Sequence, residues 1–179
     1  STLRNDSLRA EAHNAYAQVY QVKNENILAL RNYFNALRIA EDIKNNPLIK
    51  NCYLYLSDFY NSIDDYDKAI DYMTEAYKML DKVNEKNAPY QKVIFTNNIG
   101  NLYAGKKNYD IAIGYFEKSI RMADSLKFST LKIPGYISLL NQYLRIHEPV
   151  KALAYLNSPT GSDLKKYLSN SGMASVIEQ

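Results

Sequence analysis

The sequence predicts an all-α fold, a right-handed α-α superhelix of four helix pairs followed by a C-terminal capping segment. The first observation is a repeat, because a tyrosine is followed nine residues later by an alanine at four places, 40, 43 and 40 residues apart. Self-similarity at such a period is typical of solenoids. The second is that only 6 Gly and 5 Pro occur in 179 residues, which favours helices throughout. The repeated pairs are Tyr20 and Ala29, Tyr60 and Ala69, Tyr103 and Ala112, and Tyr143 and Ala152.

The first helices of the pairs are marked by prolines and by short polar connections. Pro47, Pro89 and Pro134 lie near the expected starts of the last three, where the missing N–H of proline costs least. The polar stretch 44–46 is typical of the connections between pairs. The expected ranges of the first helices are about 8–22, 48–62, 90–105 and 131–145.

The second helices follow from apolar periodicity and from capping residues. From Ala69 onward, apolar residues recur on one face at the 3.6-residue period of a helix. Pro149 is expected at the first helical position of the last one, which Pro159 keeps short. Short polar side chains favour the cap position before a helix. The expected caps are Asn24 or Asn26 in the first repeat, Asp64 with Asp65 in the second and Asn108 in the third.

We expect a single domain over residues 1–179, because no interdomain linker is visible. Residues 161–179 are expected to form a capping helix or the start of a truncated fifth repeat. An apolar solenoid end left exposed would favour a homodimer. The repeats are expected at about residues 8–46, 47–88, 89–129 and 130–160.

Charge and composition exclude several classes of partner. The net charge is +3, and the 22 basic and 19 acidic residues are interspersed, whereas nucleic-acid binding needs a clustered basic stripe. No apolar run approaches the length of a membrane span. We therefore expect neither nucleic-acid nor membrane binding through this segment. Cys52 is the only cysteine and does not decide between an extracytoplasmic (periplasmic) and a cytoplasmic location.

The chain shows no constellation of catalytic or metal-binding residues. His13 and His147 lie in the first and last repeats without neighbouring ligands of metal-site spacing. The acidic stretch 64–71 lacks the central glycine and terminal glutamate of a calcium loop. We therefore expect no enzyme activity, no metal site and no cofactor.

The repeats resemble the tetratricopeptide repeat over about residues 8–157. That family places small residues where its paired helices cross, then tyrosine, alanine and a large residue, and the third repeat matches with Gly100, Tyr103, Ala112 and Phe116. The family's usual period is about 34 residues, and the longer period here is similar to repeat arrays of bacterial sensor kinases, transcriptional regulators and peptide-responsive regulators.

The resemblance implies a concave groove lined by the first helices, which often takes an extended peptide. The position two residues before each repeat tyrosine, the groove column, is always polar. Such a ladder matches the N–H and C=O groups of a peptide backbone. The alternative is an ordinary solvated helix face in a chain rich in asparagine. The groove column is Gln18, Asp58, Asn101 and Asn141, with Asn97 and Asn98 extending it and Asn14 and Asn61 flanking it.

The predicted function is therefore non-catalytic binding of a protein or peptide ligand. The resemblance implies the sensory or scaffolding region of a larger bacterial signalling or regulatory protein. The alternative is a structural adaptor in envelope protein assembly, which would dock through its convex face or its ends.

Overall fold

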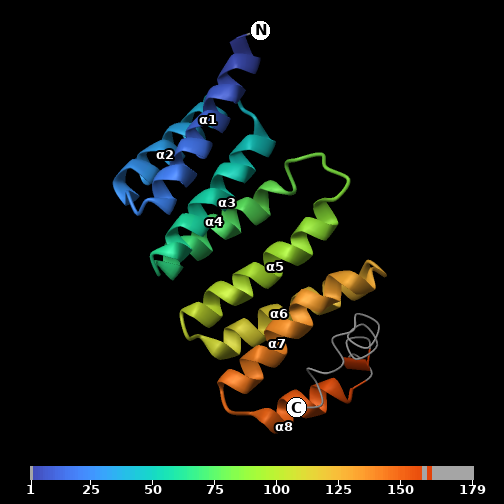
Figure 1. Ribbon diagram of the computed structural model, residues 1–179. Coiled ribbons are helices and arrows are strands. Elements are labelled where there is room, and N and C mark those ends of the chain that lie inside the picture. The colour runs from blue at the N-terminus through green and yellow to red at the C-terminus, as the bar shows by residue number, and fades with distance from the viewer. Residues whose placement is uncertain (1, 159–160, 163–179) are drawn as a thin grey trace. The chain divides into compact units, whose positions relative to one another are not determined.

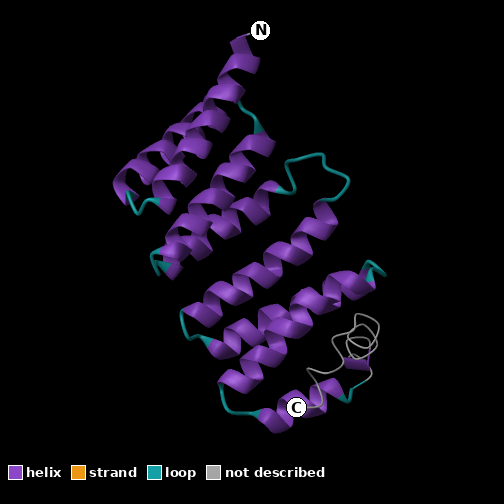
Figure 2. Cartoon of the chain, viewed as in Figure 1, coloured by secondary structure: helices purple, strands orange, loops and turns teal. Residues whose placement is uncertain are grey.

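The computed structural model describes residues 2–158 and 161–162, and all regular structure in that part of the chain is helical (Figure 2). This confirms the all-α class. The capping segment expected over residues 161–179 lies outside the described residues except for Gly161 and Ser162. The helices are α1 (Thr2–Val22), α2 (Asn26–Asp42), α3 (Asn46–Ser62), α4 (Tyr66–Met79), α5 (Ala88–Gly105), α6 (Tyr109–Ser125), the short 3-10 helix η1 (Ser129–Leu131), α7 (Lys132–Arg145) and α8 (Pro149–Leu156) (Figure 1).

The chain divides into two compact units, residues 1–95 and 96–179, and the boundary falls within α5. In the first unit α1 packs against α2 and α3 against α4, while α2 also contacts α3 (Figure 1). In the second unit α6 packs against α7, and α7 against α8. The expected first helices of the repeats are thus α1, α3, α5 and α7.

The nine-residue spacing from each repeat tyrosine to its alanine spans the connection between the two helices of a pair, which two backbone hydrogen bonds close. The carbonyl oxygen of each repeat tyrosine accepts a hydrogen bond from the N–H five residues later, at 2.9 Å in all four repeats. The carbonyl of that later residue accepts in turn from the N–H of the repeat alanine, at 3.0 to 3.2 Å. This closure is typical of a helix end with one left-handed residue. The left-handed residues are Asn24, Asp64, Lys107 and His147, with φ between 58° and 65°.

The helix caps agree with the sequence in part. A side-chain oxygen of Asp65 accepts from the N–H of Lys68, and Pro149 occupies the start of α8, as predicted. Asp64, expected to share the cap with Asp65, instead takes the left-handed position before it. The cap predicted for α2 is wrong, because its cap residue is Glu25, without a side-chain cap bond. Asn24 is used instead in the left-handed position that closes the preceding turn. Asn108 stands at the cap position of α6, also without a side-chain cap bond.

The small residues of the repeat mark close approaches between helices. A Cβ atom at Gly100 of α5 would lie 2.6 Å from Cε1 of Phe116 in α6, so only glycine fits the present spacing. In the second repeat the hydroxyl of Ser57 donates to the carbonyl oxygen of Ala69 at 2.8 Å. The repeat alanines are buried, and Phe116 fills the space beside the alanine of the third repeat. Close packing therefore explains the residues on which the resemblance depends.

Candidate ligand-binding surface

All four residues of the groove column are exposed on the first helices. In the first unit Gln18 lies on α1 and Asp58 on α3. In the second unit Asn101 lies on α5 and Asn141 on α7. Each unit therefore presents two polar column residues to solvent, on two successive first helices.

The flanking residues of the predicted groove differ in exposure. Asn61 is exposed and Asn98 is half-buried. Asn14 and Asn97 are buried, with 3% and 6% of their surface exposed. Their amides therefore face the protein.

The two buried amides bridge successive first helices. Asn14 of α1 contacts the thiol of Cys52 in α3, with Nδ2 and Sγ 3.5 Å apart. In the second unit, Nδ2 of Asn97 in α5 donates to the hydroxyl of Ser138 in α7 at 3.5 Å. That hydroxyl donates in turn to Oδ1 of Asn101 at 3.3 Å, which ties an exposed column residue to the neighbouring helix. These contacts fix the register of the helices that carry the column.

The second unit also contains a buried oxygen atom that accepts no hydrogen bond from the described residues. Oδ1 of Asn97 has no hydrogen-bond partner among the described residues. Buried polar atoms are almost always paired with protein or with ordered water. The seam between α5 and α7 thus retains capacity for a further hydrogen bond, next to the exposed Asn101.

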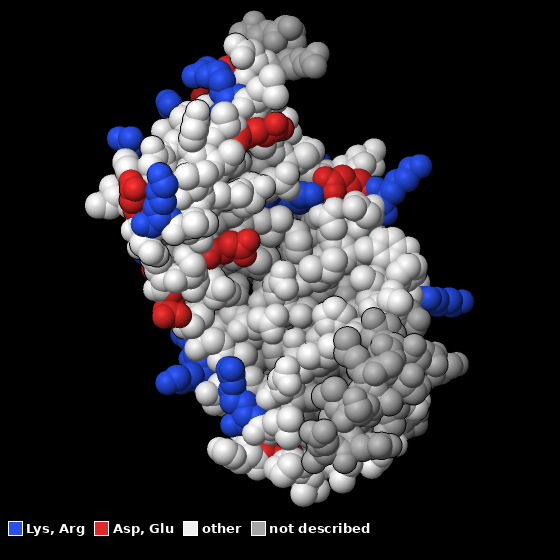
Figure 3. Space-filling model, in the orientation of Figure 1, with Lys and Arg blue, Asp and Glu red and all other residues white. Residues whose placement is uncertain are grey.

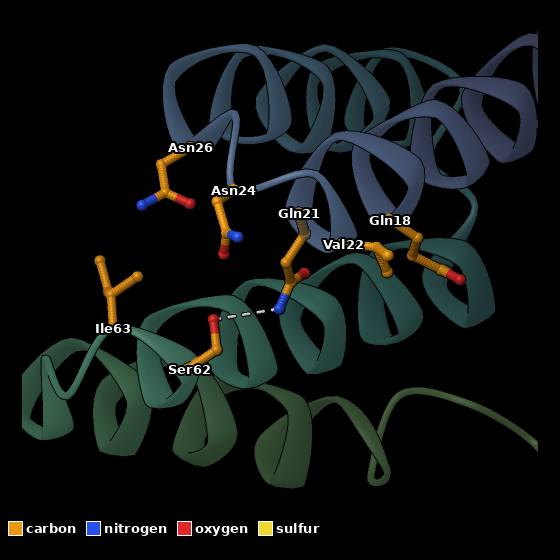
Figure 4. Close-up of a pocket in the computed structure, with 7 residues that line it drawn as sticks. All are labelled: Gln18, Gln21, Val22, Asn24, Asn26, Ser62 and Ile63. Atoms are coloured by element: carbon orange, nitrogen blue, oxygen red, sulfur yellow. Dashed lines mark hydrogen bonds between the residues drawn. The ribbon is translucent and has the colours of Figure 1, made fainter.

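The first unit contains an open pocket of about 640 Å³ beside the ends of α1 and α3 (Figure 4). Gln21 is central to its wall, because Nε2 donates to the hydroxyl of Ser62 at 3.1 Å and Oε1 accepts from the hydroxyl of Tyr33 at 2.7 Å. The wall is thus built from side chains of three helices. Its lining residues are Gln18, Gln21, Val22, Asn24, Asn26, Ser62 and Ile63.

Asp58 combines an accessible side chain with a poorly hydrated carboxyl group. The residue is exposed, yet the pKa of its carboxyl is raised above the ordinary value because neighbouring protein atoms displace water from it. The carboxyl is thus partly shielded from water although the residue as a whole is accessible. The pKa of Tyr33 is raised to about 12, first by burial and then by the charge of Asp58. The ring of Tyr33 stacks on that of Tyr55, with centroids 6.1 Å apart.

Gln21, Ser62 and Tyr33 were not among the residues expected from the sequence. Two of them could have been found from helical periodicity, since Gln21 lies three residues after Gln18 and Ser62 four residues after Asp58. Tyr33 could not, because it is a buried core residue whose hydroxyl alone reaches the wall.

Charged side chains and possible metal ligands do not cluster at one site in the described part of the chain. Basic and acidic side chains are interspersed on the face that Figure 3 shows. Within residues 2–158 and 161–162, no three His, Cys, Asp or Glu side chains are placed to hold a metal ion. None of the described helices is long and apolar enough to cross a membrane. Nδ1 of His13 lies 2.8 Å from Oδ1 of Asn32, a contact between α1 and α2.

Comparison with known proteins identifies the repeats. Residues 8–82 match the family model of the tetratricopeptide repeat. No curated protein matches the sequence.

Solved structures share the fold over nearly the whole chain. Aspartyl phosphate phosphatase F from Bacillus subtilis is 18% identical, with a TM-score of 0.73 over 93% of this chain and 42% of its own. A signal transduction ATPase with numerous domains and a tetratricopeptide repeat sensor, from Pyrococcus horikoshii, is 17% identical, with a TM-score of 0.78 over 94% of this chain and 26% of its own. A Rap protein complexed with competence and sporulation factor is 14% identical, with a TM-score of 0.62 over 94% of this chain and 45% of its own. The chain spans less than half the length of each.

Proposed function

From its similarity to tetratricopeptide repeats and its fold, we propose that this chain is a non-catalytic module that binds an extended segment of a protein or peptide through the exposed groove-column residues of each unit. The supporting observation is that the column residue of every repeat is polar and exposed on the first helix of its pair. The buried positions next to it do not follow this rule, since Asn14 and Asn97 are turned into the protein.

The column offers the chemistry that an extended backbone needs. Amide side chains carry both donors and acceptors, so Gln18, Asn101 and Asn141 can pair with backbone N–H and C=O groups irrespective of ligand sequence. Such bonds give affinity, while pockets beside them select particular side chains. The pocket next to Gln18 is large enough for a side chain of the ligand. The hydrogen bond from Ser138 holds the amide of Asn101 in place before binding, which limits the entropy lost at this position.

We further propose that the module is the sensory or scaffolding region of a larger bacterial signalling or regulatory protein. The structures it resembles include a repeat sensor and a Rap protein complexed with a factor. The chain spans less than half of those proteins, which is compatible with a binding region attached to other parts.

The proposal is tested with a phage-displayed library of random twelve-residue peptides selected on the 179-residue chain. Peptides are expected to be enriched, and the triple variant Gln18→Ala, Asn101→Ala, Asn141→Ala is expected to bind them at least about tenfold more weakly, since each lost hydrogen bond costs about 0.5–1.5 kcal/mol. Asn84→Ala removes an exposed amide away from the column and should leave binding unchanged. Enriched peptides that bind the triple variant as tightly as the wild type would refute the proposal.

A second candidate is the structural adaptor, which an apolar stripe on α1 favours. Leu8, Val19 and Val22 are 57%, 51% and 84% exposed, and Tyr16 between them is 60% exposed. Exposed apolar patches of this kind mark interaction surfaces. We expect Val19→Asp to abolish any concentration-dependent self-association in sedimentation velocity. If that variant, and not the triple column variant, removes all binding, the adaptor is the better description.

A further inference from the structure

Asp58 is an acid that the fold of the first unit does not use. Among the described residues it forms no hydrogen bond and no ion pair, whereas Glu85 of the same unit is paired with Lys50 at 2.8 Å. Burial is the only cause of the raised pKa of Asp58, so no nearby cation compensates its charge. An ionised carboxylate that has lost part of its hydration without a partner is unfavourable.

Two tyrosine rings lie near Asp58. Tyr55 lies three residues earlier on α3, so the two side chains are neighbours on one helix face. The ring of Tyr33 stacks on that of Tyr55, and the charge of Asp58 contributes to the raised pKa of Tyr33. The hydroxyl of Tyr33 is bonded to Gln21, which lines the pocket. Asp58 and the two stacked rings are therefore linked through Tyr33 to the hydrogen-bonded amide of the pocket wall.

The same side chains connect Asp58 to the pocket. Ser62, a lining residue, is four residues after Asp58 on α3, and Gln21 bonds both Ser62 and Tyr33. Asp58 thus lies one helical turn from the pocket wall, on the face that carries the column.

We propose that Asp58 and the ring of Tyr55 form a subsite for a positively charged group of the bound peptide, either a Lys or Arg side chain or a free amino terminus. The inference rests on the proposed function, because it assigns a ligand class to one position of the same groove column. A cation would supply the missing partner of the carboxylate, and it is also attracted to the face of a tyrosine ring. The side-chain oxygen of Gln18 on α1 can accept a hydrogen bond from another N–H of the bound cation.

The test compares wild type with Asp58→Asn, which keeps the size of the side chain and removes its charge. Peptides selected from the random library on the wild-type chain are expected to be enriched in Lys or Arg at one position, or to require a free amino terminus. Asp58→Asn should weaken their binding about tenfold, measured by isothermal titration calorimetry, and reduce its dependence on salt. Asp42→Asn, which neutralises an exposed acid at the end of α2, is the matched control and should have no effect.

Modified ligands separate the two sources of positive charge. Replacing the enriched basic residue by Gln, or acetylating the amino terminus, removes each in turn. The peptide that lacks the decisive charge should bind wild type and Asp58→Asn equally, as in a double-mutant cycle. If every selected peptide binds both proteins equally, yet still weakens with the triple column variant, the subsite is refuted and the proposed function stands. If the triple variant has no effect either, both are refuted.

Discussion

Replacing Gly100 by alanine should destabilise the protein although alanine is the better helix former. Gly100 lies within α5, where the change to alanine gains about 1 kcal/mol of intrinsic helix propensity. Its new Cβ atom would lie 2.6 and 2.7 Å from two ring carbons of Phe116, and 3.1 Å from Cβ of Tyr115. Ordinary carbon contacts are about 3.5–4.0 Å. The helices must therefore separate by about 1 Å, or the Phe116 ring must move.

The ring has little freedom to move, because Phe116 is only 1% exposed. Overpacking of this kind, including the backbone shifts it forces, typically costs about 1–3 kcal/mol. After the gain of about 1 kcal/mol in propensity we expect Gly100→Ala to lower the free energy of unfolding by up to about 2 kcal/mol. Because Asn101 is the next residue, the same shift should displace a residue of the groove column and weaken peptide binding.

Gly114→Ala is the matched control in the partner helix α6. A Cβ atom there meets nothing within 4 Å, so propensity acts alone and should raise stability by about 0.5–1 kcal/mol. Both glycines lie in the unit formed by residues 96–179. If the two units unfold separately, the measured stabilities of both variants therefore still refer to the same unit. The assay is urea unfolding followed by circular dichroism at 222 nm, since the chain has no Trp for fluorescence. Phe116→Leu should partly rescue Gly100→Ala. A Gly100→Ala variant as stable as Gly114→Ala would refute the reasoning.

Four further predictions concern single side chains. Lys107→Gly should raise the free energy of unfolding by about 0.5–1 kcal/mol in urea, because Lys107 has φ of 65°. Burial raises the pKa of Cys52 to about 11, so its thiol should resist iodoacetamide at pH 8 until urea unfolds the chain. Glu85→Gln should lower the free energy of unfolding by about 1–3 kcal/mol at pH 7, because buried Lys50 loses its anionic partner and keeps the amide oxygen of Gln91. This contribution of Glu85 is lost as pH falls through its lowered pKa. Asp58→Asn should raise the melting temperature at pH 7 but not at pH 3, where both side chains are neutral.

The repeat architecture was accessible to sequence reasoning because the repeat residues have local causes. The spacing from Tyr103 to Ala112 corresponds to one turn closed by backbone hydrogen bonds, and it is the same in every repeat. Gly100 is required by the contact with Phe116 inside one helix pair. The predicted cap of α2 was wrong because asparagine is favoured both at helix N-caps and at left-handed turn positions. Sequence alone does not decide which of the two Asn24 occupies.

The candidate ligand-binding surface was predictable only to the extent that exposure follows helical periodicity. Each exposed column residue lies two positions before the repeat tyrosine, whose carbonyl closes the turn after the first helix. Its position on that helix, and therefore the face to which its side chain points, follows from the repeat. The burial of Asn14 and Asn97 depends instead on Cys52 and Ser138 of a neighbouring repeat. Asn14 and Asn97 share one repeat position, six residues before the repeat tyrosine, but Cys52 and Ser138 lie eight and five residues before theirs. The periodic pattern therefore does not predict these contacts between repeats.

Asp58 is the point at which the requirements of folding and of binding diverge. The raised pKa means that the folded state binds a proton more readily than the unfolded chain, so stability declines as pH rises through the interval between the two pKa values. At neutral pH the ionised carboxylate therefore opposes folding, whereas the lowered pKa of Glu85 reflects a charge that the fold stabilises. A position that only had to keep the solenoid folded would be better filled by an amide, as the columns of the other repeats are. A variant that gains stability and loses binding of basic peptides would show that this charge serves the ligand.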